Sequence, residues 1–579
     1  PSWPIKKGYY SMTNMKNTAS WELLARLKQH GIRWLFCNSG TDFAPIIETY
    51  EAATDDEREQ FPELLTISHE TVAIGMAHGA YIVSGHPQAI MVHVHVGLAN
   101  ALMGIINCQS DQSPILVLAG KTPITEFQKH GGRMTPQQSG QDVFDQNGIA
   151  RQFVKWDSEL RDPEQIIDLI DRALGIAQQS PKGPVLLSLP REPLAGNVGA
   201  VRTSQLSIPS PPKPPIARQS EIDEVKRLLT QADRPLLIIQ KNDHESALAE
   251  ALNSLASNQG IAVIEPFTTR NAADSQKPYH LGYQSGGLVE AADLILVVES
   301  QSPWIQRFES PNAKAIIHIG QDPFWTNLPS KSHRMTLSIA GDAADTLDRL
   351  NSSVTVVNLL IQKRWEWIQK EKSKRAATLS NLKEQMEASS EITPAMVGQA
   401  MAEHMTETTR VFSELGPPPA SASPRYPNQW FTPPFSGGLG WGVPCALGAK
   451  LAAPKLQIIA CIGDGSFLFA NPLACIHTAI NLKLPILIIV MNNGAWNATR
   501  RAAHNMYPNG QAMQNTSPIL TSLDDQLDFA EISKASGIAA YTVKKPTDLK
   551  PCFNKALNAL LKGDRPVLIN IITSKTDGF

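Results

Sequence analysis

Two short motifs near the end of the chain combine residues that can hold a metal ion and a phosphate group. An apolar run ends at the sequence GDG (463–465), and a second apolar run ends 26 residues later at NN (492–493). Asp464 and Asn493 offer the oxygen ligands that Mg²⁺ takes when it bridges a diphosphate. The glycines beside the Asp let the backbone approach a phosphate closely.

The elements around these motifs must bring them together. The runs 458–462 and 485–491 are short and β-branched, which favours buried parallel strands. The segment 471–482 between them has the spacing of a crossover helix. Parallel strands present their carboxyl ends at one edge of a sheet, where open α/β folds bind ligands. The alternative is a pair of ordinary βα turns, since GDG alone also occurs in plain turns.

The first part of the chain alternates strands and helices, which predicts a parallel sheet with right-handed crossovers. The expected strands are 34–37, 64–68, 89–96, 115–119 and 184–189, and the expected helices are 19–31, 43–50, 71–84 and 97–107. Glu70 follows the second strand directly, at the start of a helix. A carboxyl group at this place could take part in proton transfer, or it could simply interact with the helix dipole.

Two histidines, His93 and His95, fall within the strand expected at 89–96. Because strand side chains alternate, we expect both histidines on the same face. Either could relay protons near neutral pH, and either could instead be a hydrogen-bonded core residue.

The middle of the chain predicts a second α/β domain behind a stiff linker. The segment 207–217 is too rich in proline for a helix or strand interior. Strands are expected at 236–240, 261–265, 294–298 and 315–319, a long charged helix at 357–386, and third-domain strands at 409–414, 458–462, 486–491 and 567–572. The central domain has no GxGxxG turn, so we expect no FAD or ADP there.

Length and composition limit the class of protein. The 579 residues are too many for one core and predict three doubly wound parallel-sheet α/β domains. The net charge of −2 gives no basic surface for nucleic acid. No apolar run of 18 residues and no signal peptide is found, so we expect no membrane partner. The six cysteines lack metal-binding spacing and indicate core residues in a reducing cytoplasm.

The expected parts are a tail or remnant (1–16), a first domain (17–195), a linker (196–217), a central domain (218–350), a linker helix (351–390) and a third domain (391–579).

These motifs together resemble the thiamine diphosphate-dependent decarboxylases and synthases, with benzoylformate decarboxylase the nearest pattern and acetolactate synthase the next. The resemblance covers most of the chain and is densest at 35–45, 67–120 and 436–497. The family's order of pyrimidine-binding (PYR), central and diphosphate-binding (PP) domains matches the partition above. The implied cofactors are thiamine diphosphate and Mg²⁺.

The resemblance also implies roles for individual residues. Glu70 would hydrogen-bond the pyrimidine ring nitrogen and favour the imino tautomer, and Leu439 would prop the cofactor into a bent shape. The metal ligands would be Asp464, Asn493 and the backbone carbonyl of Ala495. The remaining cofactor contacts would be Ser413, Gly416, Gly438, Gly463, Gly465, Ser466, Trp496 and Asn497.

The resemblance implies only a few residues of the substrate pocket. His93 matches the active-site histidine of benzoylformate decarboxylase, with His95 as the alternative, and Thr41 stands at its catalytic serine. Gln141 aligns with the active-site glutamine of acetolactate synthase, and Thr499 replaces a pocket leucine. A second active-site histidine has only His280 as a poorly aligned candidate. The pocket predicted from these residues is more polar than an aryl substrate needs.

The expected function is therefore benzoylformate decarboxylase-like decarboxylation of a 2-oxo acid, a small-molecule partner, to an aldehyde, with carboligation to 2-hydroxy ketones as a further outcome. The alternatives are an acetolactate synthase-like or a 2-hydroxyacyl-CoA lyase-like enzyme. The former usually carries FAD, and the latter a nucleotide site and a C-terminal lid, of which the sequence shows no sign. A non-enzymatic paralogue is disfavoured because Glu70, Asp464 and Asn493 are all present. In this family the cofactor lies between two subunits, so we expect a homodimer or a dimer of dimers.

Overall fold

The computed structural model describes residues 15–126, 130–199, 206–329, 333–353, 356–387, 389–515, 517–523 and 527–574. The tail expected at 1–16 lies outside the described residues up to position 14, as does the part of the linker at 200–205. Among the described residues, no helix has both the length and the apolar character needed to cross a bilayer.

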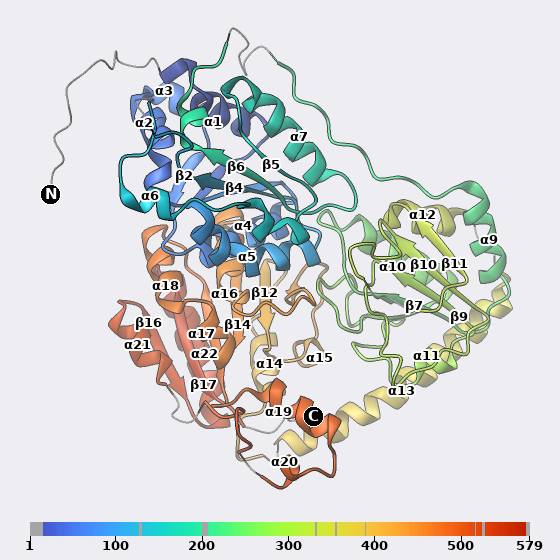
Figure 1. Ribbon diagram of the computed structural model, residues 1–579. Coiled ribbons are helices and arrows are strands. Elements are labelled where there is room, and N and C mark those ends of the chain that lie inside the picture. The colour runs from blue at the N-terminus through green and yellow to red at the C-terminus, as the bar shows by residue number, and fades with distance from the viewer. Residues whose placement is uncertain are drawn as a thin grey trace. The chain divides into compact units, whose positions relative to one another are not determined.

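Three sheets of parallel strands confirm the predicted fold class of three α/β domains (Figure 1). The chain divides into two compact units, Pro1–Ala77 with His86–Pro212 and His78–Gly85 with Lys213–Phe579. The first sheet belongs to the first unit, and the second and third sheets belong to the second unit.

The first sheet has the strand order β2-β1-β3-β4-β6-β5. Its strands are β1 (Trp34–Asn38), β2 (Glu63–Thr66), β3 (Gln88–Val92), β4 (Ile115–Lys121), β5 (Asp157–Glu159) and β6 (Val185–Pro190). The helices are α1 (Ala19–Gln29), α2 (Ala44–Ala52), α3 (Asp55–Arg58), α4 (Glu70–Ser84), α5 (Val94–Ser110), α6 (Pro136–Gly140), α7 (Ile166–Gln178) and α8 (Arg191–Ala195), with short 3-10 turns between them, one of which is η2 (Thr41–Phe43). One face of the sheet buries its apolar residues against α1 and α7.

The second sheet has the order β11-β10-β9-β7-β8. Its strands are β7 (Pro235–Ile239), β8 (Ala262–Ile264), β9 (Leu294–Val298), β10 (Ala315–Gly320) and β11 (Leu337–Ala340). Helices α9 (Gln219–Leu229), α10 (Ala247–Gln259) and α12 (Ala343–Ser353) cover one face, and α11 (Leu288–Ala291) and α13 (Asn358–Glu387) contribute to the core on the other.

The third sheet has the order β13-β12-β14-β15-β17-β16. Its strands are β12 (Thr409–Glu414), β13 (Trp430–Phe431), β14 (Gln457–Gly463), β15 (Leu487–Asn492), β16 (Ala539–Val543) and β17 (Val567–Ile572). The helices are α14 (Pro394–Ala402), α15 (Pro419–Ala422), α16 (Gly442–Ala452), α17 (Asp464–Phe469), α18 (Pro472–Asn481), α19 (Asn497–Met506), α20 (Gln511–Gln514), α21 (Phe529–Ala535) and α22 (Pro546–Lys562). Helices α14 and α22 pack on one face of the strands.

One predicted strand is wrong in a way that affects the site. The strand expected at 89–96 ends at Val92, and α5 begins at Val94. The carbonyl of His93 accepts a hydrogen bond from the Gly97 N–H at 2.7 Å, so the apolar alternation continues into a helix rather than a strand. His93 and His95 therefore do not share a strand face.

Other differences lie at the sheet edges. The short edge strands β5, β11, β13 and β16 were not predicted, because runs of two to five residues carry little periodic signal. Helix α13, expected as a linker, is fixed to the central domain. Its buried Arg364 donates to the carbonyls of Gln259 at 2.7 Å and Ala232 at 3.0 Å.

Candidate functional site

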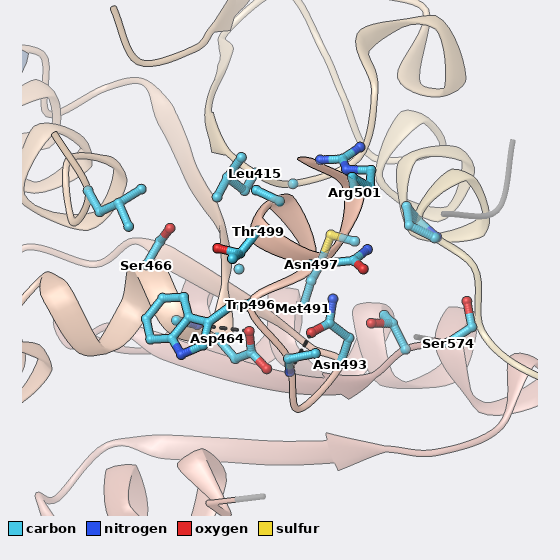
Figure 2. A pocket seen from close by; sticks show the side chains of 18 of the residues that line it. Leu415, Asp464, Ser466, Met491, Asn493, Trp496, Asn497, Thr499, Arg501 and Ser574 are labelled. Carbon is cyan, nitrogen blue, oxygen red and sulfur yellow. Dashed lines mark hydrogen bonds between the residues drawn. The ribbon is translucent and has the colours of Figure 1, made fainter. Parts of the chain in front are cut away.

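A cavity of about 390 Å³ opens at the carboxyl ends of β12, β14 and β15 (Figure 2). Most of the predicted cofactor residues line it, together with Thr499 from the predicted substrate pocket. The lining residues from those predictions are Gly416, Leu439, Gly463, Asp464, Gly465, Ser466, Asn493, Ala495, Trp496, Asn497 and Thr499. The GDG and NN motifs thus meet at one edge of the sheet, because β14 and β15 are neighbours with Gly463 paired to Met491.

Asp464 is a buried carboxylate held by the backbone. Its Oδ1 accepts from the Gly465 N–H at 2.8 Å, and its Oδ2 accepts from the Gly494 N–H at 2.7 Å. Burial raises the pKa of Asp464 above its usual value, while these backbone N–H groups act in the opposite direction. A buried carboxylate of this kind is stabilised when a cation binds beside it.

The oxygen-rich edge of the cavity fits Mg²⁺ better than a softer metal. Asn493 lies on the same side of the cavity as Asp464 in Figure 2, and its Oδ1 accepts from the Ala495 N–H at 2.9 Å. Within the described residues, no group of three or more His, Cys, Asp and Glu side chains could hold a metal. A single carboxylate with one amide suits a cation that takes its other ligands from phosphate and water.

A glycine in the cavity wall allows close approach of an aromatic ring. A Cβ at Gly465 would lie 2.3 Å from the Trp496 ring, so no side chain fits there. The indole ring therefore lies directly against the GDG backbone beside Asp464 (Figure 2). The absence of a side chain at Gly465 thus lets Trp496 pack beside Asp464 in the cavity wall.

The loop that carries Leu439 is held by a residue that the sequence did not single out. Glu414, at the end of β12, is fully buried, and its two carboxylate oxygens accept from the N–H groups of Gly440 and Gly442 at 2.7 Å each. Burial raises the pKa of Glu414 to about 7 despite these donors. Glu414 thus fixes the turn that places Leu439 in the cavity wall.

Besides Glu70, which belongs to the first domain, two predicted cofactor residues are not among those lining the cavity. Ser413 is buried, and its hydroxyl donates to the Pro417 carbonyl at 3.5 Å. Gly438 precedes the lining residue Leu439 but does not line the cavity itself. Conversely, Arg501 lines the cavity without having been predicted, and Figure 2 shows it on the side away from Asp464.

Glu70 begins α4 in the first domain and is 7% exposed. Its Oε2 accepts from the Asn100 side-chain amide on α5 at 3.1 Å. A Cβ at Gly97 would lie 3.2 Å from its Oε1, so the neighbouring helix turn also comes close. The carboxylate is therefore oriented by α5 and keeps lone pairs for a further partner.

His93 forms the centre of a second group of side chains in the same domain. Its Nδ1 makes a very short contact with Oδ1 of Asp42, which is 3% exposed, and its Nε2 lies 3.0 Å from Nε2 of Gln141. The hydrogen bond to Asp42 raises the pKa of His93 above its usual value; partial burial opposes this, and the charge of Glu70 adds to it. The structure thus brings together the predicted His93 and Gln141.

The other predicted substrate residues lie elsewhere or take no part in this contact. Thr41 begins η2 beside Asp42 and is exposed. His95 lies in the first turn of α5, and its buried Nδ1 has no hydrogen-bond partner among the described residues. His280 is buried in the central domain with Nε2 3.4 Å from Oε1 of Glu265, and it does not line the cavity.

Sequence reasoning missed Asp42, Glu414 and Arg501 as functional neighbours. Asp42 and Glu414 each stand at or just after the end of a predicted strand, which is a usable signal for an α/β protein. What the sequence did not supply was the partner of each carboxylate. Those partners are 51 residues away for Asp42 and 26 to 28 residues away for Glu414.

Three parallel sheets and a cavity that holds a buried carboxylate, Asp464, beside glycine-rich turns are typical of an α/β enzyme that binds a diphosphate cofactor. Family models agree along the chain: the N-terminal TPP binding domain of thiamine pyrophosphate enzymes matches residues 17–149, the central domain 222–350 and the C-terminal TPP binding domain 420–571. The chain belongs to the thiamine pyrophosphate enzyme family.

Similar proteins include decarboxylases and synthases. Benzoylformate decarboxylase of Pseudomonas aeruginosa is 25% identical over 96% of this chain and 98% of its own length. The acetolactate synthase large subunit of Haemophilus influenzae is 23% identical over 94% and 93%. A thiamine diphosphate-dependent 4-hydroxybenzoylformate decarboxylase of Rhodococcus jostii shares the fold, with a TM-score of 0.75, 21% identity and coverage of 97% and 100%.

Proposed function

We propose that this enzyme decarboxylates a small 2-oxo acid to an aldehyde with thiamine diphosphate and Mg²⁺, and that it can also form 2-hydroxy ketones. The observation that carries the proposal is the meeting of Asp464, Asn493 and Leu439 in one cavity of about 390 Å³. The similarity to benzoylformate decarboxylase supports the reaction class. The polar residues Gln141 and Thr499 favour a smaller or more polar substrate than benzoylformate.

The residues of the third domain fit the proposed cofactor. Asp464, Asn493 and the Ala495 carbonyl would hold Mg²⁺, and Gly465 and Ser466 would contact the diphosphate. Leu439 would support the bend between the two rings, since the carboxylate of Glu414 fixes its loop. When bound, thiamine diphosphate supplies the electron sink that accepts the electron pair as CO₂ leaves.

The residues of the first domain manage protons. Glu70, oriented by Asn100, would hydrogen-bond the pyrimidine ring of the cofactor. His93, whose pKa is raised by Asp42, would bind the substrate carboxylate as a cation and would supply the proton that the aldehyde product needs. Thr41 directly precedes Asp42, which contacts His93, and would offer its hydroxyl to the substrate.

A carboligase is the second candidate, because Gln141 contacts His93. An amide at this position can bind the carbonyl oxygen of an acceptor, as expected for an acetolactate synthase-like or 2-hydroxyacyl-CoA lyase-like enzyme. Assays with and without acceptor aldehydes, read by chromatography of the products, separate the two. Aldehyde as the main product favours the decarboxylase, and 2-hydroxy ketone favours the carboligase.

Self-association as a dimer or a dimer of dimers in a reducing cytoplasm belongs to the same proposal. Helices α17 and α18 expose Phe469 and Leu473 to more than half of their surface, as at a protein interface. All six cysteines are free thiols, as expected in such a compartment. Light scattering on the purified protein tests the assembly, and a monomer with bound cofactor would contradict it.

The test of the function is Glu70→Gln, with the exposed Glu48→Gln as the matched control. We expect turnover of the best 2-oxo acid to fall by roughly 10²- to 10⁴-fold, the usual share of a positioned acid or base. Cofactor affinity, measured by calorimetry, should change little, because the diphosphate and metal ligands lie in the third domain. Full activity of Glu70→Gln, or no CO₂ release from any 2-oxo acid by cofactor-loaded wild type, would contradict the proposal.

A further inference from the structure

The histidine of the first domain has a buried carboxylate partner that the proposed function does not require. Asp42 follows β1 and is 3% exposed, and its Oδ1 meets His93 Nδ1. Its Oδ2 accepts from the Val94 N–H at 3.4 Å. The same carboxylate therefore contacts both the ring of His93 and the backbone that follows it.

The strand register explains why these residues meet. Strands β1 and β3 are parallel neighbours, with Asn38 paired to Val92, so the residues after both strands lie at one edge. The chain turns sharply after β3, where Val94 has a φ of 33°, a conformation that is unusual for a β-branched residue. Strain of this kind persists only where the surroundings determine the conformation, and here it turns the chain from β3 into α5 immediately after His93.

Two glycines lie directly against the pair, so that any side chain at either position would displace it. A Cβ at Gly40 would lie 2.1 Å from His93 Nδ1, and a Cβ at Gly120 would lie 1.4 Å from Asp42 Oδ2. The imidazole and the carboxylate thus pack against the backbone of Gly40 and Gly120, where no side chain separates them from it. The contact is a packed feature of the domain rather than a surface ion pair.

The two ring nitrogens of His93 have different surroundings. Nδ1 faces an acceptor-only carboxylate, whereas Nε2 faces Gln141, whose amide can present either an N–H donor or an oxygen acceptor. A carboxylate on one nitrogen fixes the tautomer and leaves the other nitrogen for chemistry. Nε2 is therefore the nitrogen that can change its protonation during turnover.

The charged groups around His93 favour its cationic form. Asp42 and Glu70 are the carboxylates that act on the imidazole. Arg191 interacts with Asp42 from the start of α8, and its guanidinium donates to the carbonyls of Gly131 and Gly132 at 2.8 Å each. The carboxylates of Asp42 and Glu70 both act on the ring, whereas the guanidinium of Arg191 is hydrogen-bonded to backbone carbonyls.

We propose that Asp42 is a positioning residue that holds His93 through Nδ1–H, so that Nε2 is the nitrogen that exchanges the catalytic proton, with Gln141 turning its amide to match. This inference rests on the proposed function. In the step concerned, the Nε2–H bond breaks as a C–H bond forms on the carbon that has lost CO₂. His93 becomes neutral and keeps its Nδ1–H hydrogen-bonded to Asp42. A solvent proton then restores Nε2–H.

The role of Asp42 predicts an effect on product partition. Protonation of that carbon gives aldehyde, whereas attack on a second carbonyl gives a 2-hydroxy ketone. If His93 holds its proton less well, aldehyde formation slows and the ketone fraction rises when an acceptor is present. A residue with a merely structural role would lower both products together.

The experiment compares wild type with Asp42→Asn, and with Asp55→Asn as a control at a fully exposed aspartate. Histidine rings carry ¹⁵N and ¹³C, and the His93 signals are assigned by their loss in His93→Gln. We expect Asp42→Asn to lower the pKa of His93 by about one pH unit or more, the usual effect of removing an adjacent opposite charge. The alkaline limb of aldehyde formation should move to lower pH by the same amount, and the ketone-to-aldehyde ratio should rise.

A pKa of His93 that is unchanged in Asp42→Asn would overturn the proposal, as would a pH profile that does not follow it. Should the variant fail to fold, the wild-type spectrum alone decides, because neutral His93 must be the Nδ1–H tautomer and an Nε2–H tautomer contradicts the inference. The tautomer is read without turnover. Failure of every 2-oxo acid as substrate would therefore refute the proposed function while leaving the tautomer result separately readable.

Discussion

The cavity of the third domain and the histidine group of the first domain are built from different contacts. In the cavity, buried carboxylates accept hydrogen bonds from backbone N–H groups: Asp464 from the glycine turns beside it, and Glu414 from the turn that carries Leu439. In the histidine group, side chains contact other side chains, Asp42 with His93 and His93 with Gln141.

The difference has a consequence for how each site tolerates change. Backbone donors are fixed by the turn itself and do not depend on which side chains surround them. In a hydrogen-bonded series of side chains, the geometry depends on every member, because each side chain orients the next. We therefore expect substitutions in the cavity to affect cofactor binding, and substitutions in the histidine group to affect the proton step without loss of the cofactor.

The largest effect is expected for Asp464→Ala. Removal of the proposed metal ligand also leaves the N–H groups of Gly465 and Gly494 without their acceptor. Mg²⁺-dependent thiamine diphosphate affinity should fall by more than about 100-fold, beyond the usual cost of losing an outer-shell partner. Calorimetric titration measures this directly.

Two further variants define the cause in that experiment. Asp564→Ala removes an exposed aspartate of the same domain and should bind the cofactor as wild type does. Asp464→Asn keeps a side-chain acceptor for one backbone N–H group but loses the charge. If Asp464→Asn retains wild-type Mg²⁺ dependence, Asp464 serves the turn alone and the metal assignment is wrong.

The cavity was predictable from sequence because its determinants are local. The GDG and NN sequences end neighbouring strands, and glycines at those ends indicate a close approach of backbone to ligand. The spacing of two apolar runs around one crossover helix is enough to predict that both motifs lie at the same edge of the sheet. The same reasoning missed Glu414, since nothing local shows that its oxygens face the N–H groups of Gly440 and Gly442.

The histidine group was only partly predictable because its contacts join distant segments. His93 and Gln141 were named from a family pattern, whereas Asp42 was not, although it follows a predicted strand. The strand expected at 89–96 placed His93 and His95 on one face. The observed end of β3 at Val92 separates them. A period-2 pattern cannot show where a strand gives way to a helix when both buried elements are apolar.

A smaller effect, confined to the cavity loop, is expected for Gly440→Ala. Gly440 has a φ of 84°, and a Cβ there would lie 2.5 Å from the backbone carbon of Phe469, which has little freedom to move. Gly437→Ala is the matched control, because its φ is 74° and its Cβ would meet nothing within 4 Å. Displacing the loop that bears Leu439 by about 1 Å should reduce turnover by up to roughly 100-fold.

The two alanine variants separate crowding from backbone conformation. Gly437→Ala carries only the cost of a left-handed residue, about 1–2 kcal/mol in the free energy of unfolding. Gly440→Ala should add a further loss of about 1–3 kcal/mol for overpacking and a weaker cofactor affinity. Equal stability and equal affinity of the two variants would show that Glu414 and its turn do not position Leu439.

The smallest of the three effects is expected for Gly120→Ala, which acts on the histidine group. A Cβ at Gly120 would lie 1.4 Å from Oδ2 of Asp42, so the carboxylate must leave its place. Because a side chain can move where a backbone cannot, the fold should persist. Aldehyde formation should slow by roughly tenfold, part of the usual contribution of a positioned acid.

Cofactor affinity distinguishes this variant from those of the cavity. Calorimetry should give the same thiamine diphosphate affinity for Gly120→Ala as for wild type, because the proposed diphosphate and metal contacts lie in the third domain. Gly175→Ala, a helix position of the first domain where a Cβ would meet nothing within 4 Å, is the control for a general effect of added volume. If Gly120→Ala lowers cofactor affinity as much as Gly440→Ala does, the two sites are not separable. The distinction between a cavity that binds the cofactor and a histidine group that moves the proton would then be wrong.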